Sequence, residues 1–165
     1  MDPYIRTSRE QLSGILLSAM DAIITVDADQ RIILFNPAAE QMFRCRASEA
    51  IGQPIDRFIP TRFREAHRQH IRKFGEAKVT NRRMGALGTI SGLRADGEEF
   101  PAEASISQVE AGGQKLYTVI LRDITERKKL EEQLRQTERL AELGTLASGM
   151  AHEIGTPMNV ILGRA

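Results

Sequence analysis

Short runs rich in apolar and β-branched residues, bounded by turn residues, recur through the chain, as expected of buried β-strands. Ala22–Val26 and Arg31–Phe35 are two such runs, and the turn residues between them, Asp27-Ala28-Asp29-Gln30, indicate a hairpin. Three later strand-like stretches are joined by the turn dipeptides Asp96-Gly97 and Gly112-Gly113. They are Met84–Leu93, Glu99–Val109 and Lys115–Asp123. The pattern therefore predicts five antiparallel strands.

Helical patterns lie before and between these strands. Ser8–Met20 has the apolar spacing of a short amphipathic helix. Asn36-Pro37 opens a short helix over Ala38–Phe43, with the proline in its first turn, and Ser48 starts a further helical turn that Gly52 ends. A longer helix is predicted over Thr61–Ala77, with the Thr61 hydroxyl as its N-cap.

The last forty residues have a different pattern, that of one long helix. Residues 126–140 hold nine charged residues in fifteen, with Leu130 and Leu134 as apolar positions. A heptad repeat follows at steps of 3, 4, 3 and 4, which predicts a parallel two-stranded coiled coil: Leu140, Leu143, Ala147, Met150 and Ile154. The two halves are one residue out of phase, a break that locally changes the winding of a coiled coil. A solvated single helix is the alternative for so charged a segment.

His152 is the candidate reactive residue of this helix. With Ala147 and Ile154 at a positions and Met150 at d, His152 falls at f, the outward face. Neutral imidazole is a competent nucleophile near pH 7, because its ordinary pKa is about 6.5. The adjacent carboxylate of Glu153 can accept the ring proton as the other ring nitrogen attacks.

The segment His152-Glu153-Ile154-Gly155-Thr156-Pro157 resembles the H-box of two-component sensor histidine kinases. The resemblance implies that His152 accepts the γ-phosphoryl group of ATP and passes it to an aspartate of a response regulator. It implies that Glu153 assists phosphorylation and that Thr156 positions water for dephosphorylation. The zinc-protease pattern H-E-x-x-H is excluded, because Thr156 occupies the place of the second histidine.

Pro157 adds a mechanical expectation. It cannot donate a hydrogen bond to the carbonyl of Glu153, so we expect the helix to kink just past His152. Such a kink would make Pro157 part of the path by which a signal changes the balance between kinase and phosphatase activity.

The preceding strands and helices resemble the PAS sensor domain, an antiparallel sheet with small helices over one face. The resemblance covers about residues 11–125. Its pieces are Asp27, Ile33-Leu34-Phe35-Asn36-Pro37-Ala38, Ile51-Gly52, Arg94 to Pro101 and Arg122 to Arg127. The resemblance implies an α+β PAS fold with five antiparallel strands, followed by a long C-terminal coiled-coil helix. It also implies that Asp123, Ile124 and Thr125 transfer the signal to that helix.

The ligand of the sensor stays open, and a PAS domain that binds no ligand is one of the alternatives. Phe63, His67, His70 and Phe74 share one face of the longer helix, which should look towards the sheet. In oxygen-sensing haem-PAS kinases the proximal iron ligand sits on the equivalent helix, and His67 matches its place. Gly88, however, stands where their distal arginine would be. A hydrogen-bonded, partly buried histidine is the commoner alternative.

Flavin chemistry is disfavoured. The photoreactive cysteine of flavin photosensors belongs in the short helix after Gly52, where this chain has Ile55. Cys45 precedes that helix and is interpreted as a small apolar residue. As the only cysteine it excludes an internal disulfide and fits a reducing cytoplasm.

Composition narrows the classes further. The 165 residues carry a net charge of +1, which gives no nucleic-acid footprint. The sequence has no run of 18 apolar residues, so no membrane segment is predicted, and residues 1–11 lack the apolar core of a signal peptide. We expect a cytoplasmic location, or the cytoplasmic side of a membrane if further segments span it.

These patterns divide the chain into four regions: an N-terminal tail (1–10), a PAS sensor (11–125), a coiled-coil linker (126–140) and the first helix of a phosphotransfer domain (141–165). We expect a parallel homodimer through the C-terminal helix and the PAS domain, with a response regulator as partner. The ATP and Mg²⁺ site is expected outside this chain, which alone should be inactive. The alternatives are a PAS interaction module without ligand and a haem-based gas sensor.

Overall fold

The computed structural model describes residues 10–12, 14, 20–76, 81–83 and 89–162; for residues 81–83 and 150–162 the backbone alone is described. Residues 1–125 and 126–165 form two separate compact units. Most of the helix predicted over Ser8–Met20 lies outside the described residues, although residues 10–12 and 14 are helical.

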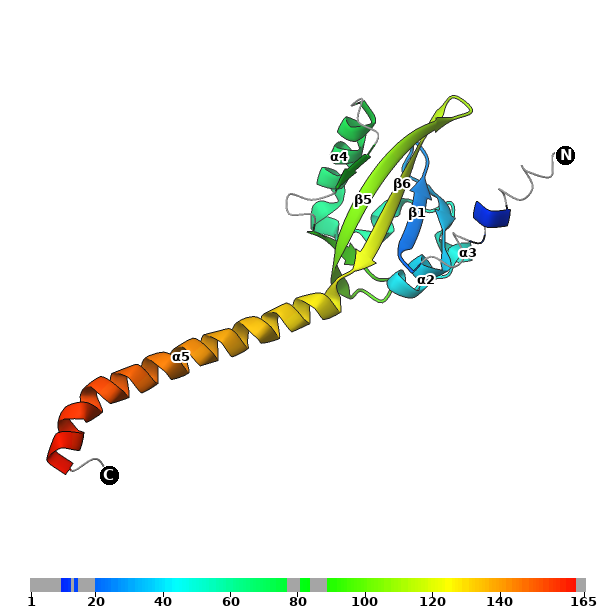
Figure 1. Ribbon diagram of the computed structural model, residues 1–165. Helices are drawn as coiled ribbons and strands as arrows, with labels where there is room; N and C mark the ends of the chain where they lie inside the picture. Colours follow the sequence, from blue (N-terminus) through cyan, green and yellow to red (C-terminus); the bar gives the residue numbers. More distant parts are fainter. Residues whose placement is uncertain (1–9, 13, 15–19, 77–80, 84–88, 163–165) are drawn as a thin grey trace. The chain divides into compact units, whose positions relative to one another are not determined.

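The first unit is built on an antiparallel sheet with strand order β2-β1-β6-β5-β3 (Figure 1). Strand β4 also pairs with β5, along residues 99–103, whereas β3 pairs with residues 105–107. The two short strands therefore form one interrupted edge, and the predicted five-stranded PAS sheet is confirmed. The strands are β1 (Ala22–Val26), β2 (Ile32–Phe35), β3 (Asn81–Arg83), β4 (Thr89–Leu93), β5 (Glu99–Ala111) and β6 (Gln114–Asp123).

Two of the predicted turns owe their shape to positive φ angles. Gly112 and Gly113 have φ of 59° and 78°, the left-handed pair that a two-residue hairpin of type I′ requires. In the β1–β2 turn, the Asp27 carboxylate accepts hydrogen bonds from the amides of Asp29 and Arg31 at 2.9 and 3.0 Å. Gln30 then adopts φ of 62°, unusual for a residue with a side chain.

Short helices and one longer helix follow β2. Asn36 caps the first of them: its Oδ1 accepts from the amide of Ala39 at 3.0 Å and from that of Ile23 in β1 at 2.8 Å. One side chain thus fixes both the helix start and its distance from the sheet. The helices are α2 (Pro37–Phe43), α3 (Ala47–Ala50), the 3-10 turns η1 (Ile55–Phe58) and η2 (Thr61–Phe63), and α4 (Arg64–Glu76).

The predicted N-cap at Thr61 is wrong. Pro60 holds the capping position, with extended ψ of 140°, and Thr61 is already inside a 3-10 turn closed by the amide of Phe63 bonding to the carbonyl of Pro60. The α-helix proper begins at Arg64, whose Nε donates to the carbonyl of Ile59 at 2.9 Å. The start of α4 is therefore fixed by an arginine reaching back, not by a threonine hydroxyl.

The core lies between these helices and one face of the sheet. Phe43 is its centre: its ring lies 4.7 Å from Phe58 and 5.5 Å from Phe100, centroid to centroid. Aromatic rings in these tilted and edge-on arrangements add about 0.5–1.5 kcal/mol each beyond the area they bury. Further along, Phe74 of α4 packs against Tyr117 of β6. The helices are thereby held against β1, β5 and β6.

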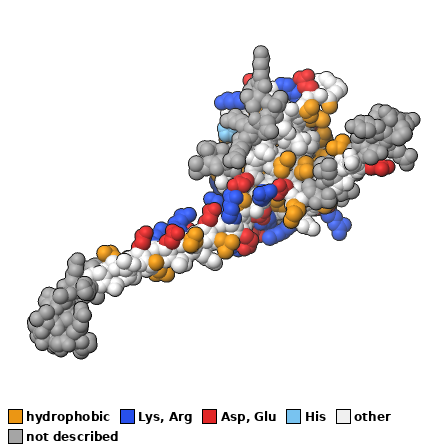
Figure 2. Space-filling model, in the orientation of Figure 1, with side chains coloured by type: hydrophobic (Ala, Val, Ile, Leu, Met, Phe, Trp, Pro, Cys, Tyr) orange, Lys and Arg blue, Asp and Glu red, His pale blue; other side chains and the backbone are white. Residues whose placement is uncertain are grey.

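Helix α5 runs from Thr125, the last residue of the first unit, to Leu162 in the second unit. In Figure 2 its apolar side chains (orange) are interspersed with charged ones (blue and red). Five of its leucines are more than half exposed: Leu130, Leu134, Leu140, Leu143 and Leu146. Within the described residues, no helix is both apolar and long enough to cross a bilayer.

Candidate functional site

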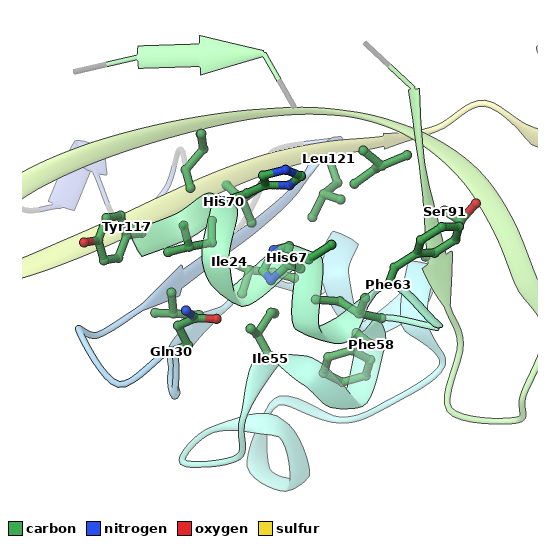
Figure 3. Close-up of a pocket in the computed structure, with 18 of the residues that line it drawn as sticks. Ile24, Gln30, Ile55, Phe58, Phe63, His67, His70, Ser91, Tyr117 and Leu121 are labelled. Carbon is green, nitrogen blue, oxygen red and sulfur yellow. The ribbon is translucent and has the colours of Figure 1, made fainter. Parts of the chain in front are cut away.

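A cavity of about 640 Å³ lies between α4 and the sheet (Figure 3). This volume is in the range of pockets that hold cofactors and small ligands. Its lining comes from β1, η1, α4, β4, β5 and β6, and most of it is apolar. The aromatic members are Phe43, Phe58, Phe63, Phe74 and Tyr117.

The four residues predicted to share one helix face all line this cavity: Phe63 at the end of η2, and His67, His70 and Phe74 of α4. The helical spacing thus identified the right face. Phe74 is buried, whereas Phe63 is 43% exposed and His70 lies towards solvent, so the face runs from core to opening.

His67 is held neutral by its surroundings. Burial lowers the pKa of its ring to about 4; the negative charge of Asp56 opposes this shift and the neighbouring His70 adds to it. At pH 7 the ring is therefore uncharged, with one nitrogen carrying a proton and the other an acceptor. Its Nδ1 is buried and has no hydrogen-bond partner among the described residues.

Gln30 provides a second unsatisfied polar atom among the residues that line the cavity. The Gln30 amide nitrogen donates to the carbonyl of Arg68 at 3.4 Å, which brings the β1–β2 turn against α4 one residue beyond His67. That bond fixes which end of the amide is oxygen, because an oxygen facing the carbonyl would be repelled. Gln30 lines the cavity, and its Oε1 is buried and has no partner in the described structure.

The sequence did not single out Gln30. Gln30 has a left-handed backbone and bonds to the carbonyl of Arg68, which lies 38 residues further along the chain. Neither feature can be recognised from the residues next to it. A Gln at the end of an Asp-Ala-Asp-Gln turn resembles an exposed loop residue until the helix is placed over it.

The residues around His67 fit haem poorly. A histidine that ligates a metal almost always donates its other ring N–H to a carbonyl, carboxylate or water, which orients the ring. Neither a carbonyl nor a carboxylate among the described residues accepts from His67 Nδ1. The Asp56 carboxylate bonds to the guanidinium of Arg68 through Oδ2, and its Oδ1 is buried without a partner among the described residues. Gly88, at the predicted distal position, lies outside the described residues.

A second polar arrangement lies where the PAS unit ends. The Arg94 guanidinium donates to the Asp123 carboxylate at 2.8 Å and to the carbonyl of Met42, and it stacks 4.0 Å from the centroid of Phe100. The other Asp123 oxygen accepts from the amide of Thr125 at 2.9 Å and from its hydroxyl. Arg94 thus connects α2, β5 and the first residue of α5.

Asp123 is held charged by this network. Burial raises the pKa of its carboxyl group, but the hydrogen bonds from Thr125 and Arg94 outweigh burial and leave the pKa below its ordinary value. Ile124, the residue between, is buried. Of the segment predicted to transfer the signal, Asp123, Ile124 and Thr125 are therefore firmly anchored in the PAS unit.

The H-box residues lie on α5. The helical backbone includes His152, Glu153, Thr156 and Pro157, and continues beyond the proline. Their side chains lie outside the described residues, so the outward direction of His152 and the kink at Pro157 stay predictions.

Three curated relatives of the chain are sensor proteins. It is 32% identical over 164 residues to Sensor protein FixL of Bradyrhizobium diazoefficiens, covering 95% of this chain and 32% of the relative. It is 29% identical over 130 residues to Oxygen sensor protein DosP of Escherichia coli, covering 74% and 16%. It is 26% identical over 163 residues to Signal transduction histidine-protein kinase AtoS of the same organism, covering 96% and 25%. The chain thus spans a third or less of their length.

A solved PAS structure and a PAS family match agree with the strand order described above. The PAS domain of a protein from Colwellia psychrerythraea superposes with a TM-score of 0.64 at 22% identity, covering 72% of this chain and 98% of that structure. The sequence profile of the PAS domain matches residues 20–126, more than half of the chain. The chain belongs to the PAS domain family and is related to the sensor domains of histidine kinases.

Proposed function

We propose that this chain is the sensory and dimerisation portion of a two-component sensor histidine kinase, in which the PAS unit controls phosphorylation of His152. One observation carries the proposal: the H-box sequence lies on the same continuous helix that begins at Thr125, where Asp123 of the PAS unit caps it. The relatives named Sensor protein FixL and Signal transduction histidine-protein kinase AtoS support the same assignment.

The proposed chemistry is phosphoryl transfer from Mg²⁺–ATP held by a catalytic domain. A ring nitrogen of neutral His152 attacks the γ-phosphorus, and the N–P bond forms as the bond to the ADP oxygen breaks. Glu153 accepts the proton that the ring loses. The phosphoryl group then passes to an aspartate of a response regulator. When the protein acts as a phosphatase, Thr156 positions the water that hydrolyses this group from the regulator.

The pathway of the signal is proposed to run through Arg94. The cavity-lining residues Phe43 and Gly92 both contact Phe100, whose ring stacks under the Arg94 guanidinium. A ligand or partner that moves the aromatic cluster would change the Arg94–Asp123 pair and so the cap of α5. Pro157 is proposed to let the helix bend near His152 in response.

The phosphorylation is tested in the longer protein that holds the catalytic domain, with γ-labelled ATP. We expect an acid-labile, base-stable label that disappears in His152→Ala. The chain offers a matched control, because it has three histidines: His70→Ala, which replaces an exposed histidine of α4, should keep the label. Label that is acid-stable, or that persists in His152→Ala, refutes the proposal.

We also propose a parallel homodimer through α5. Leu140 and Leu143, at the a and d positions, are 68% and 55% exposed, and a second helix packed along this seam would cover them. Leu143 and Leu146 are nearly equally exposed in the single chain, at 55% and 59%. In the proposed register they differ in position, because Leu143 is a d residue and Leu146 a g residue. Leu143→Lys should therefore weaken the dimer in sedimentation equilibrium at least tenfold, whereas Leu146→Lys should change it little. Equal effects of the two substitutions would reject this register.

The same measurements separate the rival function. If the chain is a PAS interaction module and no kinase portion, the dimer persists while no histidine in the longer protein is labelled. We place the protein in the cytoplasm or at the cytoplasmic face of a membrane, where ATP and response regulators are present.

A further inference from the structure

We propose that the cavity between α4 and the sheet binds an uncharged aromatic molecule that carries one hydroxyl group, with the hydroxyl paired to Gln30 and His67. This molecule would be the stimulus of the proposed sensor. The site itself, however, is inferred from the cavity alone and does not depend on whether His152 is phosphorylated.

The hydroxyl is inferred from the two unsatisfied atoms. Gln30 Oε1 can only accept a hydrogen bond, and it is buried without a donor among the described residues. Leaving such an atom unpaired costs about 1–3 kcal/mol, so a ligand that supplies a donor recovers that free energy. The bond from Gln30 Nε2 to the carbonyl of Arg68 holds the amide in this orientation before any ligand arrives.

His67 provides the complementary group. Its ring is neutral because burial keeps its pKa near 4, and its unpartnered Nδ1 can carry the ring proton as a donor. A hydroxyl can donate to Gln30 and accept from His67 at once, since it has one proton and two lone pairs. Figure 3 labels both side chains among those that line the cavity, and the bond from Gln30 to the carbonyl of Arg68 brings Gln30 to the residue that follows His67 in α4.

The body of the molecule is inferred from the walls. Rings of Phe43, Phe58, Phe63 and Phe74 line the cavity, and aromatic surfaces favour stacked or edge-on aromatic partners. An anion is disfavoured for two reasons. Gln30 Oε1 would oppose its oxygens, and the neutral His67 provides no positive charge to offset its desolvation.

A set of matched probes tests the proposal on the chain itself: 2-naphthol, its methyl ether 2-methoxynaphthalene, and 2-naphthoate. The ether keeps the shape and loses the donor, whereas the naphthoate replaces it with a negative charge. By calorimetric titration we expect 2-naphthol to bind about 5- to 10-fold more tightly than the ether, the factor of one hydrogen bond. The naphthoate should bind more weakly than either.

Variants then locate the hydroxyl. Gln30→Met, of similar shape, should lower the affinity for 2-naphthol to that for the ether and leave the ether unchanged, and His67→Phe should act in the same direction. Gln69→Met is the matched control, because Gln69 lies exposed on α4, does not line the cavity and donates to Glu65 at 3.4 Å. It should change neither affinity. Thermal melts check that each variant is folded, and if Gln30→Met is not, the comparison of the three probes on the unaltered chain decides.

Several results would overturn the proposal. They are equal affinities for 2-naphthol and its ether, tighter binding of the naphthoate, or no binding of any probe at its solubility limit. A Soret band that forms on titration with haemin and disappears in His67→Phe, but not in His70→Phe, would instead identify a haem site. A negative result here leaves the labelling of His152 untouched, so the two proposals fail separately.

Discussion

Replacing Arg94 by methionine should destabilise the PAS unit strongly and specifically through Asp123. Methionine preserves much of the buried stem but removes the charge, the 2.8 Å hydrogen bond to Asp123 and the bond to the Met42 carbonyl. The Arg94 side chain is 8% exposed and that of Asp123 is 28% exposed, so water replaces the lost partner only in part.

The magnitude follows from the bonds that are lost. A hydrogen bond between charged groups contributes about 1.5–3 kcal/mol, and a desolvated cation over an aromatic ring up to about 2 kcal/mol. Because Asp123 keeps some access to solvent and its bonds to Thr125, we expect a loss of about 3 kcal/mol in the free energy of unfolding. For a domain of this size that lowers Tm by roughly 12 °C.

The assay is urea unfolding of the original chain, Arg94→Met, Asp123→Asn and the double variant. The asparagine keeps the oxygen that caps Thr125 and removes the charge. We expect a coupling free energy of about 2 kcal/mol between the two positions. The pKa of Asp123 is lowered in the folded state, so the stabilisation exists above the ordinary value of 3.8 and disappears as pH falls through the folded value. Additive effects of the two substitutions, or a coupling that does not decrease as pH falls through the titration of Asp123 followed by NMR, would refute the reasoning.

Three further predictions concern the cap, the core and the histidine of the cavity. Asn36→Ala should lower the free energy of unfolding in urea by about 2–3 kcal/mol, because two amides and a backbone carbonyl lose their partner. Asn36→Asp keeps the acceptor and should lower it less. Equal losses for the two variants would contradict this role. Gly92→Ala should lower the free energy of unfolding by about 1–3 kcal/mol, since its Cβ would lie 2.6 Å from Cζ of the buried Phe100. The companion change Phe100→Leu should relieve part of the clash. A Gly92→Ala chain as stable as the original would show that the Phe100 ring moves aside. The His67 ring should titrate near pH 4 by NMR. Because the unfolded ring binds its proton near pH 6.5, stability should fall as pH drops from 6.5 towards 4, and His67→Phe should abolish that slope.

The parts of the fold that could be predicted were those with local signals. Signals within a few residues mark the Asp-Gly and Gly-Gly turns, the alternation along β5, and Asn36-Pro37 at the start of α2. Thr61 was misassigned because a threonine before a helix is a good cap in general, whereas here Pro60 already turns the chain. The short β3 was missed, since a three-residue strand of polar residues has no period to detect.

The residues of the candidate site that could be predicted from the sequence were likewise those with local signals. The inner face of α4 was visible from helical spacing, and so were the H-box and the segment from Asp123 to Thr125. The pairing of Arg94 with Asp123 across 29 residues was not, although both lay in segments that the PAS resemblance named. Gln30 was hidden for the same reason, because its role depends on where a distant helix lies.

The far end of the β5–β6 hairpin offers a practical consequence. Beyond Ser107 of β5 and Tyr117 of β6, no other strand that the structure describes pairs with either strand of the hairpin. Here β5 and β6 pair only with each other, Val109 with Leu116, Glu110 with Lys115 and Ala111 with Gln114. A two-stranded ribbon alone is marginally stable in water, and solvent-exposed loop tips tolerate insertions. A fluorescent label or short epitope placed between Gly112 and Gly113 would therefore report on the protein in cells with little disturbance to its core.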